Sequence, residues 1–283
     1  MAVSTWKEAD LCTRALLLIN GDNYSAWNLR KELILIKHQR EILLEEVKLT
    51  AMVLGKKPKS GETWAHRRWI LDKLGDFDLS AELALSTMTA ESYPKNYYSW
   101  THRTWLLPQL DRAVLLKECQ FVRDWSARHF THYCSFHYLQ NALRRCLQFV
   151  GPEDTHRFLT NEQEFIARLL EIFPDHESLW CHRRFIVHLT SLVADSSTLL
   201  EYVSKEYDSL MKAEAPQIKP SRFAYAHILW SLFFVYRSGL SPKLVSRDSI
   251  YHCFDKLSSP VNRVVSSIFF AVERVVSSAE EEL

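Results

Sequence analysis

The stretch from Pro94 to Leu106, PKNYYSWTHRTWL, decides the fold because its pattern recurs along the chain. Close copies are NYSAWNLR at 23–30, SGETWAHRRW at 60–69 and HESLWCHRRF at 176–185, with a degenerate copy, HYCSFHYLQ, at 132–140. The aromatic anchors are separated by 37, 36, 36 and 44 residues, and they are Trp27, Trp64, Trp100, Phe136 and Trp180. A self-similar period of about 36 residues is typical of helical repeat arrays.

Each copy carries signals for a turn followed by a helix. Six positions before the tryptophan stands a residue that ends the preceding helix, namely Gly21, Pro58, Pro94 or Pro174. The tryptophan and the arginine three positions later share one helix face. We expect the indole to fill the seam between neighbouring hairpins, and the guanidinium to stack on it or to pair with a carboxylate across the seam. The predicted structural anchors are Trp27, Arg30, Trp64, Arg67, Trp100, Arg103, Phe136, Trp180 and Arg183.

A histidine recurs two positions after three of the tryptophans, as His66, His102 and His182. Recurrence in three copies favours a repeated hydrogen bond at the seam over a unique catalytic role.

The stretches 40–54 and 78–91 between the motifs have apolar residues at helical spacing. Two helices per repeat predict an all-α fold, a right-handed α-α superhelix in which helical hairpins form a crescent. We expect a single α-solenoid domain over 1–283, ending in divergent helices over 206–283 that include an amphipathic helix at 261–278. The predicted repeats are at about 16–50, 53–88, 89–122, 125–160 and 169–205.

The composition excludes several classes of function. The 283 residues contain 35 Lys and Arg against 34 Asp and Glu, which argues against nucleic acid as the main partner. None of the six glycines belongs to a phosphate-binding loop, and none of the six cysteines forms a CxxC pair. Charges at Lys7, Glu8 and Asp10 argue against a signal peptide, and the apolar stretch 223–236 is too short to span a bilayer. We therefore expect a cytoplasmic protein with reduced thiols.

The repeated unit Pro-x-Asn-Tyr-x-x-Trp-x-His-Arg-x-Trp-x-Leu resembles the repeat of the protein prenyltransferase α subunits. The signature of tetratricopeptide repeats, Trp-x2-Leu-Gly-x2-Tyr, is absent. The resemblance covers about 16–189, and AWNLRKEL at 26–33 and SLWCHRR at 178–184 are most similar to the divergent, α-like branch of repeat-containing proteins. The resemblance implies a partner, a prenyltransferase β subunit such as that of Rab geranylgeranyltransferase. It also implies that this partner holds zinc and most of the lipid pocket.

The resemblance also implies candidate site residues. In the family, a lysine and a tyrosine of a Lys-Asn-Tyr-x-x-Trp stretch lie beside the isoprenoid diphosphate, and these correspond to Lys95 and Tyr97. A positioned ammonium and a phenol stabilise the charge that develops on a departing diphosphate. The implied co-substrates are an isoprenoid diphosphate and a cysteine-bearing protein, with no cofactor on this chain itself. Read from the residues alone, Lys-Asn-Tyr before a helix is a solvated turn.

The chain departs from the family pattern at two places. Glu62 stands where farnesyl-type α chains have a glutamine that meets the carboxylate of a CaaX tail, and an anion there would repel that carboxylate. The fourth copy has Phe136 and Leu139 in place of tryptophan and arginine. His132 and Tyr133, in the turn of that copy, are further candidates for the partner or substrate rim.

The same turn holds His129, His132, Cys134 and His137 within nine residues. This cluster has the residue types of a zinc site, but closed sites need ligands that converge from more than one segment, so we expect no metal here. With no catalytic triad or carboxylate pair in the sequence, two functions remain. The chain is either the α-like subunit of a geranylgeranyl-transferring heterodimer or a non-catalytic scaffold that binds a protein through its concave face.

Overall fold

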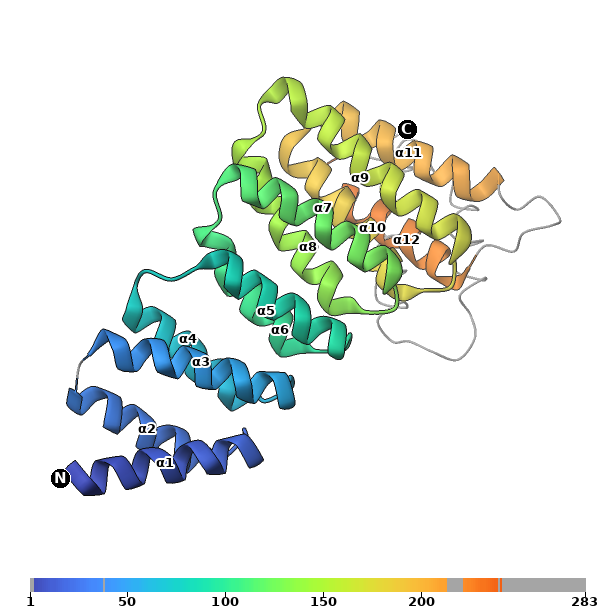
Figure 1. The fold of residues 1–283 in the computed structure, drawn as a ribbon. Helices are drawn as coiled ribbons and strands as arrows, with labels where there is room; N and C mark the ends of the chain where they lie inside the picture. Colours follow the sequence, from blue (N-terminus) through green and yellow to red (C-terminus); the bar gives the residue numbers. More distant parts are fainter. Residues whose placement is uncertain (1–2, 38, 213–220, 239, 241–283) are drawn as a thin grey trace. The chain divides into compact units, whose positions relative to one another are not determined.

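The computed structural model describes residues 3–37, 39–212, 221–238 and 240, and every regular element in these ranges is a helix (Figure 1). The all-α prediction is therefore confirmed. Contacts divide the chain into two compact units, residues 1–143 and 144–283, which are described separately below. That the whole chain acts as one domain stays a prediction. None of the described helices is long and apolar enough to cross a membrane.

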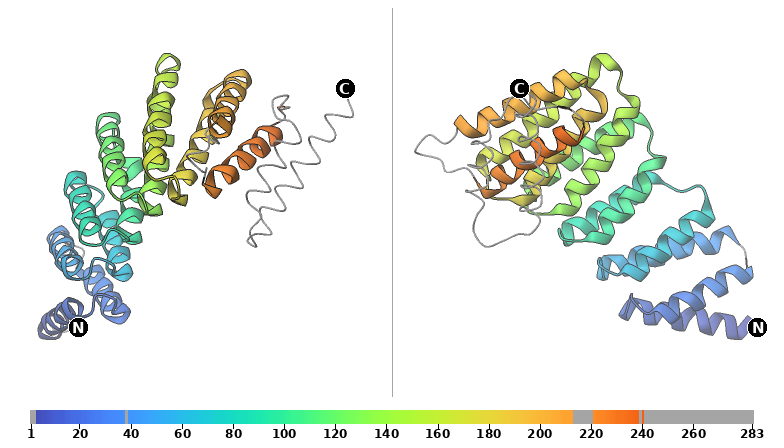
Figure 2. Two further views of the ribbon diagram at one scale, coloured as in Figure 1. Left: turned by 90° about the vertical axis from the view of Figure 1, so that its right-hand side faces the viewer. Right: turned by 180° about the vertical axis from the view of Figure 1, so that it is seen from behind.

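The first unit is built from helical hairpins. Its helices are α1 (Val3–Ile19), α2 (Tyr24–Lys37), α3 (Arg40–Lys56), α4 (Gly61–Leu74), α5 (Leu79–Ser92), α6 (Tyr97–Leu106), the 3-10 helix η1 (Leu107–Gln109), α7 (Arg112–Arg128) and α8 (Tyr133–Cys146), whose last turn crosses the unit boundary. Helix α1 contacts α3, which contacts α5, while α2 contacts α4, which contacts α6. First and second helices of the hairpins therefore form two layers (Figure 2).

The second unit continues the alternation. It contains η2 (Leu147–Phe149), α9 (Pro152–Ile172), α10 (Glu177–Val193), α11 (Ser196–Lys212) and α12 (Arg222–Arg237). Helix α9 pairs with α10 and α11 pairs with α12, and a cluster of buried residues on α10, α11 and α12 forms its core. The amphipathic helix predicted at 261–278 lies outside the described residues.

Polar side chains start the helices of the first unit. Ser60 Oγ accepts a hydrogen bond from the Thr63 N–H, and Asp111 and Asn96 act in the same way at α7 and α6. Such N-cap bonds satisfy amide groups that have no partner inside the helix. The sequence therefore sets where each hairpin turns.

The recurring proline or glycine has a second role that the sequence did not reveal. The indole N–H of Trp64 donates to the carbonyl of Pro58 at 2.9 Å, six residues earlier. Trp27 binds the Gly21 carbonyl at 2.7 Å in the same way, and Trp180 binds the Pro174 carbonyl at 2.6 Å. Each of these three tryptophans thus fastens the turn that precedes its own helix, whereas the buried indole N–H of Trp100 makes no such bond to the described residues. All five aromatic anchors are buried, as residues that fill a seam must be.

Candidate functional site

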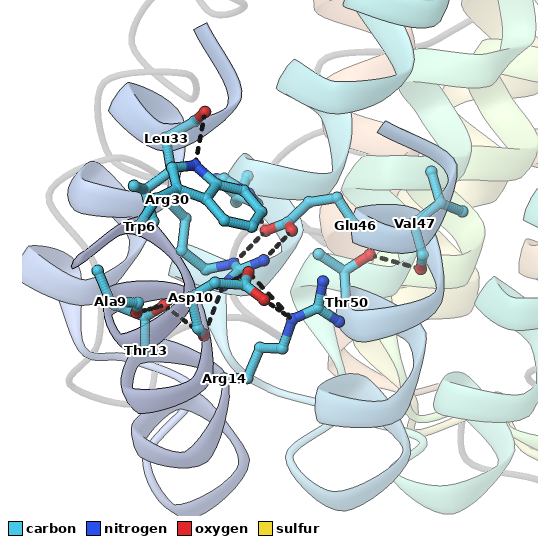
Figure 3. A network of polar contacts seen from close by, with 11 residues as sticks. Trp6, Ala9, Asp10, Thr13, Arg14, Arg30, Leu33, Glu46, Val47 and Thr50 are labelled. Carbon is cyan, nitrogen blue, oxygen red and sulfur yellow. Dashed lines mark hydrogen bonds and ion pairs between the residues drawn. The ribbon is translucent and has the colours of Figure 1, made fainter. Parts of the chain in front are cut away.

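The recurring arginines pair with glutamates that the sequence analysis missed. Arg30 on α2 donates from Nε and Nη2 to the two carboxylate oxygens of Glu46 on α3, at 2.7 and 2.5 Å. Figure 3 shows this pair between Asp10 and Thr13 of α1 and the turns of α3. Both side chains are buried, so the pair joins the first hairpin to the second from inside the seam.

The same bidentate pair recurs at later seams. Arg67 on α4 binds Glu82 on α5 at 2.8 and 2.6 Å, and Arg103 on α6 binds Glu118 on α7. In the second unit, Arg183 on α10 donates from Nε and Nη2 to the two carboxylate oxygens of Glu206 on α11, each at 2.5 Å. The predicted pairing of guanidinium and carboxylate across the seam is therefore confirmed.

Each of these glutamates also binds a side chain from its own hairpin. His66 Nε2 lies 2.8 Å from Glu46, and His102 Nε2 lies 3.0 Å from Glu82. In the degenerate fourth copy, Tyr138 takes this place and donates its O–H to Glu118 at 2.9 Å. The repeated hydrogen bond expected of the histidines is confirmed for His66 and His102, while His182 Nε2 lies 3.9 Å from Glu162. We call the recurring Arg–Glu pairs, together with the histidine or tyrosine bound to each glutamate, the ladder. Its signal in the sequence is a glutamate 20 residues before each histidine or tyrosine.

The pKa shifts of the ladder residues indicate a structural role. Burial raises the pKa of Glu46, but hydrogen bonds from Arg30 and His66 outweigh it and lower the pKa to about 2. Burial lowers the pKa of His66. A carboxylate that stays ionised while bound on two sides is a poor general acid or base at neutral pH. The ladder therefore holds hairpins together and leaves chemistry to other residues.

The candidate site residues lie at the hairpin turns of the first unit. We call residues 20–24, 56–62, 91–98 and 128–133 the turn edge, and hydrogen bonds link the first of these turns to the second and the second to the third. Ser60 Oγ donates to the Gly21 carbonyl at 2.9 Å, and Asn96 Nδ2 donates to the Pro58 carbonyl at 2.7 Å. Between the third and fourth turns, Arg128 Nη2 lies 3.9 Å from a carboxylate oxygen of Glu91, and the ammonium of Lys95 contributes to lowering the pKa of His132.

Lys95 and Tyr97 flank a buried residue that holds their turn in place. Asn96 between them is buried and both caps α6 and binds the preceding turn. Lys95 is exposed, and Tyr97, the first residue of α6, is 63% exposed. Lys95 and Tyr97 thus form the solvated turn that the sequence alone suggests, and the hydrogen bonds of Asn96 hold that turn in place.

The other rim candidates share this edge. Glu62 is half-buried in the first turn of α4, and His132 is half-buried just before α8, whose first residue is the exposed Tyr133. Burial lowers the pKa of His132, and His129 and Lys95 lower it further. His132 is therefore neutral at pH 7, and the structure brings all five candidates to one edge.

Two further residues at or near this edge do not stand out in the sequence. Tyr98 lies over the start of α4, where a Cβ on Gly61 would approach its ring to 2.9 Å. Arg68 is half-buried. Burial lowers its pKa, and the opposing effects of Asp72 and Tyr97 are smaller. The glycine was the available signal, because the first, third and fourth copies have Tyr24, Tyr97 and Tyr133 at that motif position.

The edge offers an ammonium, phenol hydroxyls and a neutral imidazole, a set that binds anions. Within the described ranges, no group of three or more His, Cys, Asp or Glu residues is arranged to hold a metal ion. The histidines and cysteine of 129–137 therefore do not converge into a site of that kind.

A family model described as "Protein prenyltransferase alpha subunit repeat" matches residues 6–36, 43–74, 79–110 and 159–190. These ranges correspond to the hairpins α1–α2, α3–α4, α5–α6 and α9–α10. The family repeat is thus one hairpin of the structure, and the degenerate copy on α7–α8 is not among the matched residues.

Curated relatives carry related names. Protein prenyltransferase alpha subunit repeat-containing protein 1 from Homo sapiens is 32% identical over 234 residues, covering 62% of this chain and 58% of the relative. The Danio rerio protein of that name is 29% identical over 233 residues, covering 62% and 54%. The chain thus spans a little over half the length of these relatives. Geranylgeranyl transferase type-2 subunit alpha from Candida albicans is 32% identical over 77 residues, 24% of this chain and 21% of the relative.

The fold is also found in a solved structure. Candida albicans protein geranylgeranyltransferase-I complexed with GGPP gives a TM-score of 0.54 at 17% identity, over 96% of this chain and 72% of that chain. At this identity the similarity establishes the fold.

Proposed function

The chain belongs to a divergent, α-subunit-like family of proteins with protein prenyltransferase repeats, and from this premise we propose that it is the α-like subunit of a heterodimeric protein prenyltransferase. In this proposal a β subunit, such as that of Rab geranylgeranyltransferase, holds the zinc ion and the lipid pocket. The assembled enzyme transfers an isoprenoid from its diphosphate to a cysteine of an acceptor protein. The name of the Candida albicans relative supports geranylgeranyl as the isoprenoid.

One observation carries the proposal, namely the placement of Lys95 and Tyr97. The buried Asn96 fixes their turn, while the ammonium and the phenol stay accessible to a ligand. In prenyl transfer the carbon–oxygen bond to the diphosphate breaks while the sulfur–carbon bond forms, and the diphosphate leaves with the electron pair. Charge develops on its oxygens, which an ammonium and an O–H donor stabilise.

Glu62 limits which acceptors fit. It lies on the same edge, at the first turn of α4, and its negative charge disfavours a C-terminal carboxylate there. The acceptor in this proposal is therefore held by contacts other than the free carboxylate of a CaaX tail.

The second candidate is a non-catalytic scaffold that binds a protein partner. The ladder favours it, because the recurring arginines bind glutamates of the next hairpin and His66 and His102 bind glutamates of their own hairpins. In this alternative Lys95 and Tyr97 are ordinary turn residues. Their substitution should therefore slow prenyl transfer if the chain is a catalytic subunit, and should have no such effect if it is a scaffold.

The experiment is co-expression with candidate β subunits, followed by measurement of complex formation and of geranylgeranyl transfer to a cysteine-bearing acceptor. Lys95→Ala and Tyr97→Phe should each lower kcat by about tenfold or more while the complex stays intact. Lys48→Ala is the matched control, because Lys48 is an exposed lysine on α3, away from the turn edge, and pairs with Glu45. A stable complex whose transfer rate is unchanged by Lys95→Ala would favour the scaffold.

A further inference from the structure

A group of lysines and a tyrosine lies on the turn edge beside the proposed catalytic residues. Lys56 and Lys57 end α3, Lys59 lies in the turn before α4, and Tyr93 follows α5. All four are exposed, with Tyr93 at 52%. We call these four residues the lysine–tyrosine surface.

A contact between two hairpins organises this surface. The Lys59 ammonium lies over the Tyr93 ring, 4.6 Å from its centroid, so that the second and third turns are joined by a cation–π pair. The hydrogen bond from Asn96 to the Pro58 carbonyl fixes the backbone of both turns beneath that pair. The lysine–tyrosine surface therefore rests on a rigid base.

The charge of this surface is not neutralised. Within the described part of the chain, no carboxylate lies within 4.0 Å of the ammonium groups of Lys56, Lys57 or Lys59, whereas Lys48 on the same helix pairs with Glu45 at 2.7 Å. Part of the acidic charge of the turn edge is engaged by other residues, and Glu91 lies 3.9 Å from Arg128. Asp22 accepts a hydrogen bond from Ser60 at 2.7 Å, and Glu62 is half-buried. Three lysines in four positions thus present a local positive field to solvent.

We propose that the lysine–tyrosine surface docks an acidic peptide segment of a protein partner. Lysines supply charge complementarity to clustered Asp and Glu side chains, and tyrosine is the residue type that adds contact area at little conformational cost. The proposal concerns binding alone and does not depend on whether the chain supports prenyl transfer.

The geometry favours a peptide over other anionic partners. Single-stranded nucleic acid binds through bases that stack on open aromatic faces, but one face of Tyr93 is already covered by Lys59. Membrane surfaces are bound by basic residues together with apolar side chains that insert, and the surface as defined offers one phenol and no aliphatic side chain. An acidic peptide needs neither of these features.

The test uses the full chain, in complex with its β partner if one is required for solubility. Fluorescence anisotropy would measure binding of a labelled peptide of ten glutamates, with the glutamine peptide of equal length for comparison. We expect binding of the glutamate peptide alone, weakening steeply between 50 and 300 mM salt. Lys57→Glu/Lys59→Glu should weaken it by about tenfold or more.

The control variant is Lys48→Glu/Lys73→Glu, which changes the same net charge at exposed lysines of α3 and α4 away from these residues. It should keep most of the affinity. Lys57→Ala/Lys59→Ala covers the case in which the charge reversal alters folding, and it should also weaken binding of the glutamate peptide. The alanine and glutamate variants of Lys57 and Lys59 should both keep the circular dichroism spectrum of the parent. Equal peptide binding by parent and Lys57→Glu/Lys59→Glu would overturn the proposal.

Anionic lipid vesicles and an oligouridine RNA serve as competing probes. Either probe binding where the peptide does not, in a manner lost in Lys57→Glu/Lys59→Glu, would also overturn the proposal and reassign the surface. Because Lys95 and Tyr97 are unchanged in these variants, a failure here leaves the prenyltransferase test intact, and the reverse also holds.

Discussion

Arg67 and Glu82 form a buried bidentate pair that joins the second hairpin to the third. The guanidinium donates to both carboxylate oxygens at 2.8 and 2.6 Å, and its remaining nitrogen binds the Val47 carbonyl and Thr50 Oγ1. The carboxylate also binds His102. A charge with this many partners is well satisfied while buried, but removal of one partner leaves the others without compensation.

Glu82→Ala should therefore lower the free energy of unfolding by about 3–5 kcal/mol, because Arg67 and His102 stay buried without their anion. Urea denaturation followed by circular dichroism measures the change. Glu45→Ala is the control, since Glu45 is an exposed partner of Lys48, and it should leave the free energy of unfolding nearly unchanged. A loss below about 1 kcal/mol for Glu82→Ala would contradict a supporting role for the ladder.

The first unit should lose stability in acid. The pKa of Glu46 is about 2 in the fold against 4.5 ordinarily, so its contribution is full above pH 4.5 and is lost as pH falls toward 2. Burial lowers the pKa of His66 below 6.5, so the neutral form is favoured by folding, and that contribution starts to decline as pH falls below 6.5.

Denaturation midpoints measured between pH 7 and pH 3 test this direction. Glu46→Gln should reduce the midpoint at pH 7 and flatten its decline below pH 4.5. A midpoint in the parent protein that rises on acidification would be inconsistent with the ladder as described.

Two glycines offer a matched pair of substitutions. A Cβ on Gly21 would lie 2.8 Å from Val53 and 3.1 Å from the Ser60 and Thr63 hydroxyls, whereas a Cβ on Gly55 would meet nothing within 4 Å. Gly21→Ala should destabilise by about 1–3 kcal/mol through overpacking at the turn. Gly55→Ala lies in α3 and should be neutral or stabilise by up to about 1 kcal/mol. Thermal melts of both variants against the parent measure the difference, and equal melting temperatures would contradict the close approach at Gly21.

Tyr138 tests the degenerate fourth copy. Burial and the Glu118 carboxylate raise its pKa, so the O–H stays protonated and donates to Glu118. Tyr138→Phe removes only this donor and should cost about 1–2 kcal/mol in unfolding free energy. Tyr24→Phe, at an exposed tyrosine that begins α2, should be close to neutral. If both substitutions have the same effect, the fourth copy does not need its hydroxyl.

The sequence predicted the buried tryptophans more completely than the glutamates that pair with the arginines. The tryptophans recur at a nearly constant period and need one kind of environment, so their burial could be inferred directly. The burial of the ladder glutamates was less evident, because an acidic residue on an amphipathic helix usually faces water and their signal is only a constant spacing of 20 residues before a histidine or tyrosine. Glu46 differs from Glu45 only in which face of α3 it occupies, yet one is buried and the other exposed.

By itself, the sequence determined the helical hairpins, the residues that start each second helix, and the Trp and Arg side chains that fill the seams. These are local or periodic properties, which spacing along one chain can express. The tertiary structure alone decided what lies beside what. It brought Lys95 within electrostatic reach of His132 and placed Lys59 over Tyr93. Those neighbours come from different hairpins, and their distance depends on how one hairpin packs against the next.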